Sequence, residues 1–365
     1  IPLDVMGMPA PAPAPRTDKA SPSWDMGKIG EVAAKARAAR MPLILAGGGA
    51  RRAETPLRLL AERLDAPVVT TVNARGLLHR HPLAVHASPS LKAVRTMIGE
   101  ADLVVAVGTE FGPTDYDMYA DGGSVLPRNL LRIDIDADQL ARHPVAIPLK
   151  GDAAELLDAL VAELGDVRAD RGTGVERAAA TREAAWAEIG PVMRDQVRAV
   201  EAIRDALPRS LIVGDSTQPV YAANLCYDHD RPGGWFNAST GYGALGYAPP
   251  AAIGAAIARP DLPVVCLVGD GGFQFTLPEI AVAAERGVAV IFVVWNNRGY
   301  REIETSMRDA GVEPVGVSPA PPDFVKLADA YRIPAERIAS ASGLRAALIH
   351  ARAAGGPRLV EIVVD

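Results

Sequence analysis

Short apolar runs alternate with amphipathic stretches along most of this sequence. The apolar runs are rich in Val, Ile and Leu, have the pattern of buried strands, and lie at 42–46, 67–71, 103–108, 129–134, 145–149, 211–213, 264–268 and 288–295. Stretches with helical periodicity lie at 29–39, 57–64, about 174–188 and 193–207. Because such strands need cover on both faces, the pattern predicts an α/β fold with two doubly wound parallel-sheet domains.

Two stretches interrupt this alternation and indicate how the chain is organised. Pro alternates with Ala from Pro9 to Pro15, which favours extended polyproline geometry and predicts a linker. The stretch Asp166–Gly174 is polar and contains Gly, so it is a candidate boundary. Ile1–Val5 has the pattern of a strand end, which suggests a domain upstream. We therefore expect a linker at 1–20, an α/β domain at 21–165, a helical connector at 166–209 and a second α/β domain at 210–365.

Composition excludes several classes of protein. Hydrophobic residues make up 49% of the 365, so sizeable cores can form, and a net charge of −6 without a basic block argues against nucleic acid as a partner. No apolar stretch approaches the ~20 residues of a membrane span, and the start has neither a signal-peptide pattern nor a Met. Cys226 and Cys266 are the two cysteines, which predicts no disulfide framework and fits a cytoplasmic location.

The most informative stretch runs from Gly269 to Asn297 and reads GDGGFQFTLPEIAVAAERGVAVIFVVWNN. Asp270 follows one apolar strand and Asn297 follows the next, and parallel strands of a βαβ unit end at the same edge of a sheet. The two side chains should therefore lie side by side, where a carboxylate and an amide oxygen suit Mg²⁺. Gly271 and Gly272 leave N–H groups free at a helix N-terminus, where a diphosphate can bind. A helix cap and a turn would explain Asp270 and Asn297 singly, but not their combination.

GDG followed by NN at this spacing resembles the signature of enzymes that use thiamin diphosphate (ThDP). The resemblance covers nearly the whole chain and is to the family of acetolactate synthase, pyruvate decarboxylase and benzoylformate decarboxylase. It implies that 21–165 is the central domain and 210–365 the diphosphate-binding domain. It also implies a pyrimidine-binding domain, in cis or on another chain, whose glutamate activates the cofactor. No catalytic residue of this sequence can be given that role.

Further segments have roles that the resemblance implies. Ser216, Thr217 and Gln218 would place donors on the diphosphate, although a turn that caps a helix remains an alternative. Leu245 would be the wedge that bends the cofactor, and the carbonyl of Gly243 would meet its pyrimidine amino group. The other expected cofactor contacts are Gly269, Gly271, Gly272 and Tyr300, and the expected metal ligands are Asp270, Asn297 and the backbone oxygen of Gly299.

The segment YREIETSM at 300–307 lies where relatives line the substrate pocket. Acetolactate synthases have Met, Val and Trp at the positions that hold Glu302, Ile303 and Ser306 here. Glu302 would place negative charge near a cationic substrate tail, because a carboxylate pairs selectively with a guanidinium. A solvated helix face is the alternative interpretation. The runs GDSTQPVYAAN at 214–224 and NNRGYREIE at 296–304 together resemble most the acetolactate-synthase-like 5-guanidino-2-oxopentanoate decarboxylases.

The resemblance implies ThDP- and Mg²⁺-dependent decarboxylation of a small 2-oxo acid by a homo-dimer or tetramer. Acetolactate synthase-type carboligation remains open, as does a non-catalytic truncated module for assembly or regulation. FAD is not expected, because the HPL at 81–83 is not followed by the Gly-Met-His-Gly-like stretch of the FAD-binding synthases. His81 and His86 lie in a loop-like stretch and are expected to be surface or capping residues.

Overall fold

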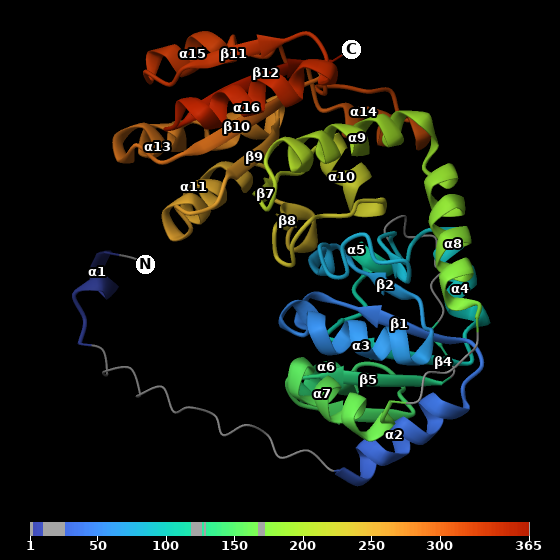
Figure 1. Cartoon of the computed structure of the whole chain (residues 1–365). Coiled ribbons are helices and arrows are strands. Elements are labelled where there is room, and N and C mark those ends of the chain that lie inside the picture. The colour runs from blue at the N-terminus through green and yellow to red at the C-terminus, as the bar shows by residue number, and fades with distance from the viewer. Residues whose placement is uncertain (1–2, 10–25, 118–125, 128, 167–171, 365) are drawn as a thin grey trace.

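The computed structural model describes residues 3–9, 26–117, 126–127, 129–166 and 172–364. Two six-stranded sheets are stacked in the view of Figure 1, the first from the N-terminal half of the chain (blue to green) and the second from the C-terminal half (yellow to red). All strand pairings within the two sheets are parallel. The predicted α/β fold with doubly wound parallel sheets is therefore confirmed.

The first sheet has the strand order β3-β2-β1-β4-β5-β6. Its strands are β1 (Pro42–Ala46), β2 (Val68–Thr70), β3 (Ala84–Val85), β4 (Leu103–Val107), β5 (Leu130–Asp134) and β6 (Ile147–Lys150). Successive side chains of β1 point to opposite faces, so Ile44 belongs to one apolar core and Leu45 to the other. The helices of this half are α2 (Met26–Ala38), α3 (Glu54–Leu64), α4 (Lys92–Glu100), α5 (Pro113–Tyr116), α6 (Ala137–Ala141) and α7 (Ala153–Leu164).

The second sheet has the order β11-β12-β10-β9-β7-β8. Its strands are β7 (Leu211–Gly214), β8 (Trp235–Asn237), β9 (Val264–Gly269), β10 (Val290–Asn296), β11 (Ala335–Ile338) and β12 (Arg358–Val363). Phe292 and Val293 of β10 enter separate cores on the two faces. The helices are α10 (Gln218–Leu225), α11 (Ala248–Ala258), α12 (Asp270–Phe275), α13 (Ile280–Arg286), α14 (Arg301–Asp309), α15 (Phe324–Ala330) and α16 (Leu344–Ala354).

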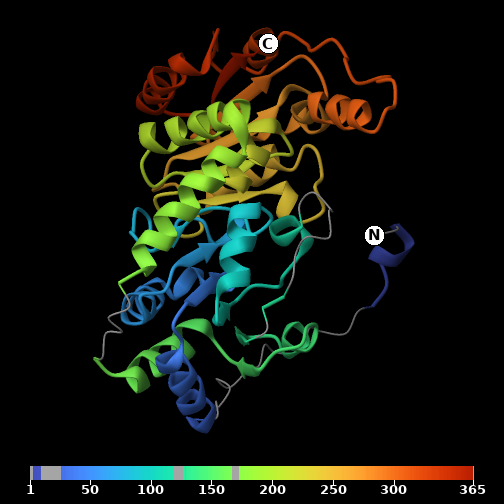
Figure 2. The ribbon, with the colours of Figure 1, turned by 90° about the vertical axis from the view of Figure 1, so that its right-hand side faces the viewer.

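Two long helices, α8 (Gly174–Glu188) and α9 (Gly190–Ala206), connect the halves. Helix α8 packs against α4 and β3, whereas α9 packs against α10 and α16. In Figure 2 these light-green helices run along one side of the molecule from the first sheet to the second. Short 3₁₀ turns complete the fold: η1 (Gly48–Arg52), η2 (Val72–Ala74), η3 (Ala238–Thr240), η4 (Leu277–Glu279) and η5 (Ala341–Gly343).

The beginning of the chain differs from the sequence expectation. Leu3–Met6 form a helical turn, α1, rather than the end of a strand. A strand needs a partner for its backbone, whereas here a local bond from the N–H of Met8 to the carbonyl of Val5 is made instead. Most of the expected Pro/Ala linker, and part of the expected boundary at 166–174, lie outside the described residues. No helix in the described ranges is long and apolar enough to cross a bilayer.

Candidate active site

Parallel pairing of β9 with β10 brings two predicted metal ligands to one edge of the second sheet. The register places Gly269 opposite Trp295, so Asp270 and Asn297 follow neighbouring strand ends. One of the two amide atoms of the Asn297 side chain lies 3.2 Å from Asp270 Oδ1 and 2.8 Å from the carbonyl oxygen of Gly299. The three residues expected to bind a metal therefore converge.

The orientation of the Asn297 amide decides what this convergence point can bind. With its nitrogen toward the other two residues, the amide donates to the oxygens of both Asp270 and Gly299. With its oxygen there, three oxygens face one another, and a cation between them would relieve their repulsion. In that orientation the amide nitrogen donates to Gln218 Oε1 over 2.9 Å. Carboxylate, amide and carbonyl oxygens are ligands that Mg²⁺ accepts, so the residues fit this metal.

The expected metal ligands are shielded from solvent. Asp270 is 2% exposed and Asn297 is 8% exposed. Burial raises the pKa of the Asp270 carboxyl above its usual value, and hydrogen bonds from the backbone of Gly271 and Gly299 partly offset this rise. No group of three His, Cys, Asp or Glu side chains in the described part of the chain could hold a metal. A cation at this point would therefore need further oxygens from a bound ligand or from water.

Asn296, the first residue of the Asn pair, shapes the adjacent turn. Its Nδ2 donates to Oε1 of the buried Glu361 over 2.6 Å, and its Oδ1 accepts from the N–H of Arg298 over 3.1 Å. Arg298 has a φ of 60°, and a Cβ on Gly299 would lie 2.6 Å from the carbonyl oxygen of Val317. The turn thus requires glycine at 299, and Asn296 holds it without facing the convergence point.

The glycines after β9 allow the first turn of α12 to pack closely against its neighbours. A Cβ on Gly271 would lie 2.4 Å from Cε1 of Tyr300, and one on Gly272 would lie 2.8 Å from Oδ1 of Asp215. Such distances leave no room for a side chain. The first turn of α12 therefore presents its backbone beside Asp270, as the sequence predicts for a diphosphate site.

Asp215 joins two loops of the site. Its carboxylate is completely buried and accepts from the N–H groups of Ser216, Gly246 and Ala248 over 2.9, 3.2 and 2.9 Å. Burial raises its pKa, and these hydrogen bonds act in the opposite direction. The Ser216 hydroxyl also donates to the Gly243 carbonyl over 3.1 Å. The loop after β7 thereby fixes the segment that contains Leu245.

These loops and strand ends enclose a cavity of about 230 Å³. It is lined by Ser216, Thr217, Gln218, Tyr221, Gly243, Leu245, Gly269, Asp270, Gly271, Gly272, Asn297, Gly299, Tyr300, Arg301, Glu302 and Ile303. The set contains every residue that the sequence analysis assigned to the cofactor or the metal, and two of the three assigned to the substrate. Ser306 is not in the set; it is exposed one turn further along α14, where its Oγ donates to the backbone oxygen of Glu302 over 2.9 Å.

Glu302 lines the cavity and makes no ion pair within the described residues. The neighbouring Arg301 is paired, because its Nη1 lies 2.6 Å from Glu304 Oε2, and Glu304 shares its other oxygen with Arg308. Glu302 is exposed on α14, but desolvation by the surrounding protein still raises the pKa of its carboxyl, and the charge of Asp309 adds to the rise. A cationic group beside Glu302 would reverse this effect.

Sequence reasoning missed three residues of the site. Arg301 and Tyr221 line the cavity, and Asp215 holds its loops together. Tyr221 follows Gln218 by three positions in α10, a spacing that places both on one helix face and could have pointed to it. Burial raises the pKa of Tyr221, which a hydrogen bond with Ser216 partly offsets.

Comparison with known families matches both halves of the chain. The family model described as "Thiamine pyrophosphate enzyme, central domain" matches residues 29–160. The model described as "Thiamine pyrophosphate enzyme, C-terminal TPP binding domain" matches residues 214–362. The second match contains both the β7 loop and the β9–β10 unit that form the cavity.

Individual relatives agree with the family models. "Probable 2-ketoarginine decarboxylase AruI" of Pseudomonas aeruginosa is 38% identical over 340 residues, which are 91% of this chain and 60% of the relative. "Probable acetolactate synthase large subunit" of Methanocaldococcus jannaschii is 30% identical over 349 residues, or 89% of this chain and 57% of the relative. The chain thus spans about 60% of the length of these curated relatives.

Solved structures share the fold. A thiamine diphosphate-dependent 4-hydroxybenzoylformate decarboxylase of Rhodococcus jostii has a TM-score of 0.74 at 23% identity, covering 96% of this chain and 66% of that one. Benzoylformate decarboxylase from Polynucleobacter necessarius has a TM-score of 0.75 at 21% identity, covering 98% and 68%. With both family models and the AruI relative in agreement, this chain belongs to the thiamine pyrophosphate enzymes and contains their central and C-terminal TPP-binding domains.

Proposed function

We propose that the cavity at the ends of β9 and β10 holds ThDP and Mg²⁺ and serves the decarboxylation of a 2-oxo acid. The observation that carries the proposal is the convergence of Asp270, the Asn297 amide and the Gly299 carbonyl beside the first turn of α12. A module for assembly or regulation would not need buried oxygen ligands at this place. The convergence therefore favours an enzyme over the non-catalytic alternative.

The protein's part would be to bind and orient. Asp270, Asn297 and the backbone oxygen of Gly299 would hold the metal. The diphosphate would bind to backbone N–H groups of α12 and to polar side chains of the β7 loop, which are Ser216, Thr217 and Gln218. When bound, ThDP supplies a carbon nucleophile and an electron sink for the departing carboxylate. The rigid loops would fix the relative positions of the groups and so lower the entropy cost of reaction.

Two apolar or aromatic side chains would complete the cofactor site. Leu245 is held by the loop that Asp215 organises, where it would support the bent cofactor as the resemblance implies. Tyr300 packs against Gly271 and would close the diphosphate end. Gly243 would offer its carbonyl oxygen to the pyrimidine ring, in exchange for its present bond with the Ser216 hydroxyl.

The proposed substrate is a 2-oxo acid with a cationic tail such as 5-guanidino-2-oxopentanoate. Glu302 supports this assignment, because it lines the cavity without an ion pair in the described residues, while the adjacent Arg301 is held in an ion pair by Glu304. The 38% identity to a relative named as a 2-ketoarginine decarboxylase points the same way. Ile303 would supply apolar cover, and Ser306 would act only through the backbone of Glu302. Acetolactate synthase-type carboligation is the second candidate, because the M. jannaschii relative is named for it.

The same proposal includes the further domain and the further subunits that a complete active site would need. A pyrimidine-binding domain, in cis or on another chain, would supply the activating glutamate, in a homo-dimer or tetramer. The division at 21–165, 166–209 and 210–365 belongs to the proposal, as does the expectation that FAD is not used. Cytoplasmic location is proposed from the cysteine usage.

Calorimetric titration of the chain with ThDP tests the cofactor assignment. Heat of binding in the presence of Mg²⁺, and its loss in EDTA, is the expected result. Binding that is equal with and without the metal would overturn it. A panel of 2-oxo acids, assayed with a pyrimidine-binding domain present, then tests the substrate: the guanidino acid should give a higher kcat/KM than pyruvate, and the reverse order would favour the synthase-type reaction.

A further inference from the structure

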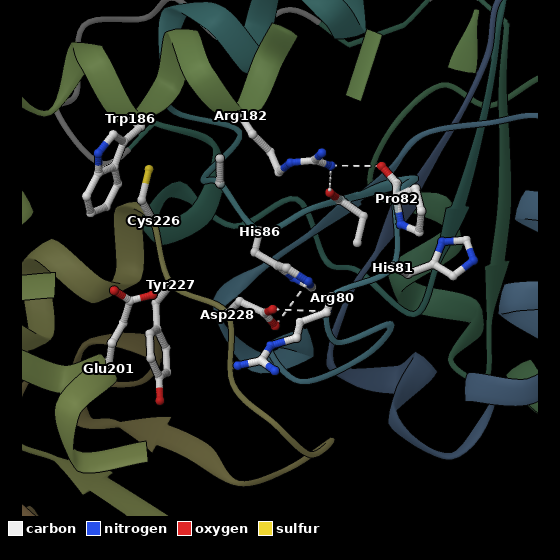
Figure 3. A pocket seen from close by; sticks show the side chains of 12 residues that line it. Arg80, His81, Pro82, His86, Arg182, Trp186, Glu201, Cys226, Tyr227 and Asp228 are labelled. Carbon is white, nitrogen blue, oxygen red and sulfur yellow. Dashed lines mark hydrogen bonds and ion pairs between the residues drawn. The ribbon is translucent and has the colours of Figure 1, made fainter. Parts of the chain in front are cut away.

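A second and larger cavity lies where the two halves of the molecule meet (Figure 3). Its volume is about 420 Å³, and none of its lining residues lines the candidate active site. Beneath it the halves are joined by backbone bonds: Ala87 and Cys226 form an antiparallel bridge, and the N–H of Ser88 donates to the carbonyl of Leu225 over 2.7 Å. The cavity therefore has a fixed floor and a volume within the range of small-molecule sites.

The acidic side chains of this cavity already have partners. Asp228 accepts from the N–H of Arg80 over 3.2 Å, and its Oδ1 lies 3.1 Å from His86 Nε2. Glu201 lies 3.6 Å from Nη1 of Arg204, and partial burial raises its pKa. Both acids are therefore in contact with protein groups, although the His86 imidazole, whose pKa is lowered to about 4, does not cancel the charge of Asp228.

The cationic side chains lack such partners. Within the residues that the structure describes, neither Arg80 nor Arg182 has a carboxylate at ion-pair distance. Nη1 of Arg182 donates to the carbonyl oxygens of Pro82 and Ala84 over 2.8 and 2.6 Å, which fixes the guanidinium without neutralising it (Figure 3). Burial lowers the pKa of Arg182, while Asp228 acts in the opposite direction. A bound carboxylate would supply the missing counter-charge in the planar geometry that arginine favours.

The remaining lining is largely apolar. Trp186 on α8 lines the cavity with a half-buried side chain, whereas Tyr227, on the segment after α10, is 2% exposed and packs its ring in the second half of the molecule (Figure 3). Pro82, Ala87 and Cys226 add small apolar surfaces. We propose that this cavity binds a small organic carboxylate, with its charged end on Arg182 and an apolar, aromatic body against Trp186.

Such a ligand would contact three parts of the chain at once. Arg80 and Pro82 belong to the first half, Arg182 and Trp186 to the connecting helix α8, and Cys226 to the second half. Binding to this junction would stabilise the folded arrangement of both halves, because a ligand that binds only the native state raises its stability. The site does not depend on the proposed ThDP chemistry.

Fluorescence titration of the full chain with 4-phenylbutyrate tests the proposal. We expect saturable quenching that disappears in Trp186→Phe, together with an upward shift in Tm. The uncharged analogue 4-phenylbutan-1-ol and inorganic phosphate should each bind at least about tenfold more weakly. The alcohol lacks the negative charge, and phosphate lacks the aromatic body. No saturable change at millimolar 4-phenylbutyrate, or equal binding of the alcohol, would overturn the proposal.

Two arginine variants locate the charged contact. Arg182→Gln should weaken 4-phenylbutyrate binding about tenfold or more while leaving the alcohol unaffected. The side chain of Arg80 makes no hydrogen bond or ion pair with the described residues, so Arg80→Gln should fold; it should weaken binding less, and it still tests the proposal if Arg182→Gln does not fold. The matched control is Arg308→Gln on the exposed face of α14. Wild-type affinity in both cavity variants would contradict the assignment.

Discussion

The imidazole of His86 lies 3.1 Å from the carboxylate of Asp228, and this contact joins the end of β3 to the segment after α10. Nδ1 of the ring is hydrogen-bonded to the Thr70 hydroxyl at 3.0 Å, whereas Nε2, although close to Asp228, makes no hydrogen bond with the described residues. Burial lowers the pKa of His86 to about 4, although Asp228 opposes this shift. The expectation of a surface position for His86 is wrong, because its side chain is 8% exposed at the junction of the two halves.

His86 should make the stability of the protein depend on pH. Its folded pKa of about 4 is below the ordinary value of 6.5, so between these values the unfolded state binds more protons. The free energy of unfolding that neutral His86 contributes is fully present above pH 6.5. It is lost as the pH falls toward 4. In His86→Gln, the decrease in unfolding free energy from pH 7 to 4.5 should be smaller by about 2 kcal/mol.

Urea denaturation at these two pH values measures the effect. His350→Gln is the control, because the side chain of His350 is 79% exposed and pairs only loosely with Glu336 at 4.0 Å. If His86→Gln and His350→Gln lose the same free energy on acidification, the titration of His86 is not coupled to folding.

Asp270→Asn should remove the metal dependence of cofactor binding. The substitution keeps the shape of the side chain but replaces an anionic oxygen at the point where Asn297 and Gly299 converge. Affinity for ThDP in the presence of Mg²⁺ should fall at least about tenfold, and chelation of the metal should cause no further loss. Calorimetry measures both quantities. Asp309→Asn, which changes an exposed carboxylate of α14, should bind like the wild type; metal-dependent binding of normal strength by Asp270→Asn would place the metal elsewhere.

Glu302→Gln should change substrate preference rather than turnover in general. Loss of the carboxylate removes a charge-assisted contact, so KM for a guanidino 2-oxo acid should rise about tenfold while that for pyruvate changes little. Steady-state kinetics with a pyrimidine-binding domain present provide the measurement. The control is Glu285→Gln, an exposed acid of α13 outside the cavity. An equal change for both substrates would assign Glu302 to the helix surface.

Two Gly→Ala substitutions should have opposite effects on stability. In Gly271→Ala, the new methyl group would lie 2.4 Å from Cε1 of Tyr300, which should lower the free energy of unfolding by about 1–3 kcal/mol. Gly254 lies inside α11 with nothing within 4 Å of the added Cβ, so Gly254→Ala should raise it by about 0.5–1 kcal/mol. Denaturant unfolding compares the two, and the double variant Gly271→Ala/Tyr300→Ala should recover part of the loss. A neutral Gly271→Ala would mean that Tyr300 moves freely.

The strand ends of the site were predictable because they follow from periodicity. The apolar runs that end at Gly269 and Trp295 fix two parallel strands, and the shared sheet edge then brings Asp270 and Asn297 together. The resemblance to the ThDP enzymes indicated Leu245, which lines the same cavity. These residues could be placed without knowing any loop conformation.

The remaining residues depend on loops and long-range packing, which sequence patterns do not encode. Asp215 is in the site because its carboxylate meets N–H groups more than thirty positions later in the chain. Ser306 shares a helix face with Glu302 but lies one turn beyond the cavity, since each helical residue rises about 1.5 Å. The burial of His86 depends on a junction between the two halves that neither half shows alone.

The two possible orientations of the Asn297 amide have a consequence for how the protein would bind the proposed metal. Without a cation, the amide nitrogen can donate hydrogen bonds to the oxygens of both Asp270 and Gly299. These bonds offset the repulsion between the two oxygens. A half-turn of this one terminal amide converts the donor into a third oxygen ligand. Binding of the cation would then need no movement of the backbone. The protein without a cation would be unstrained, with its oxygen ligands already in place.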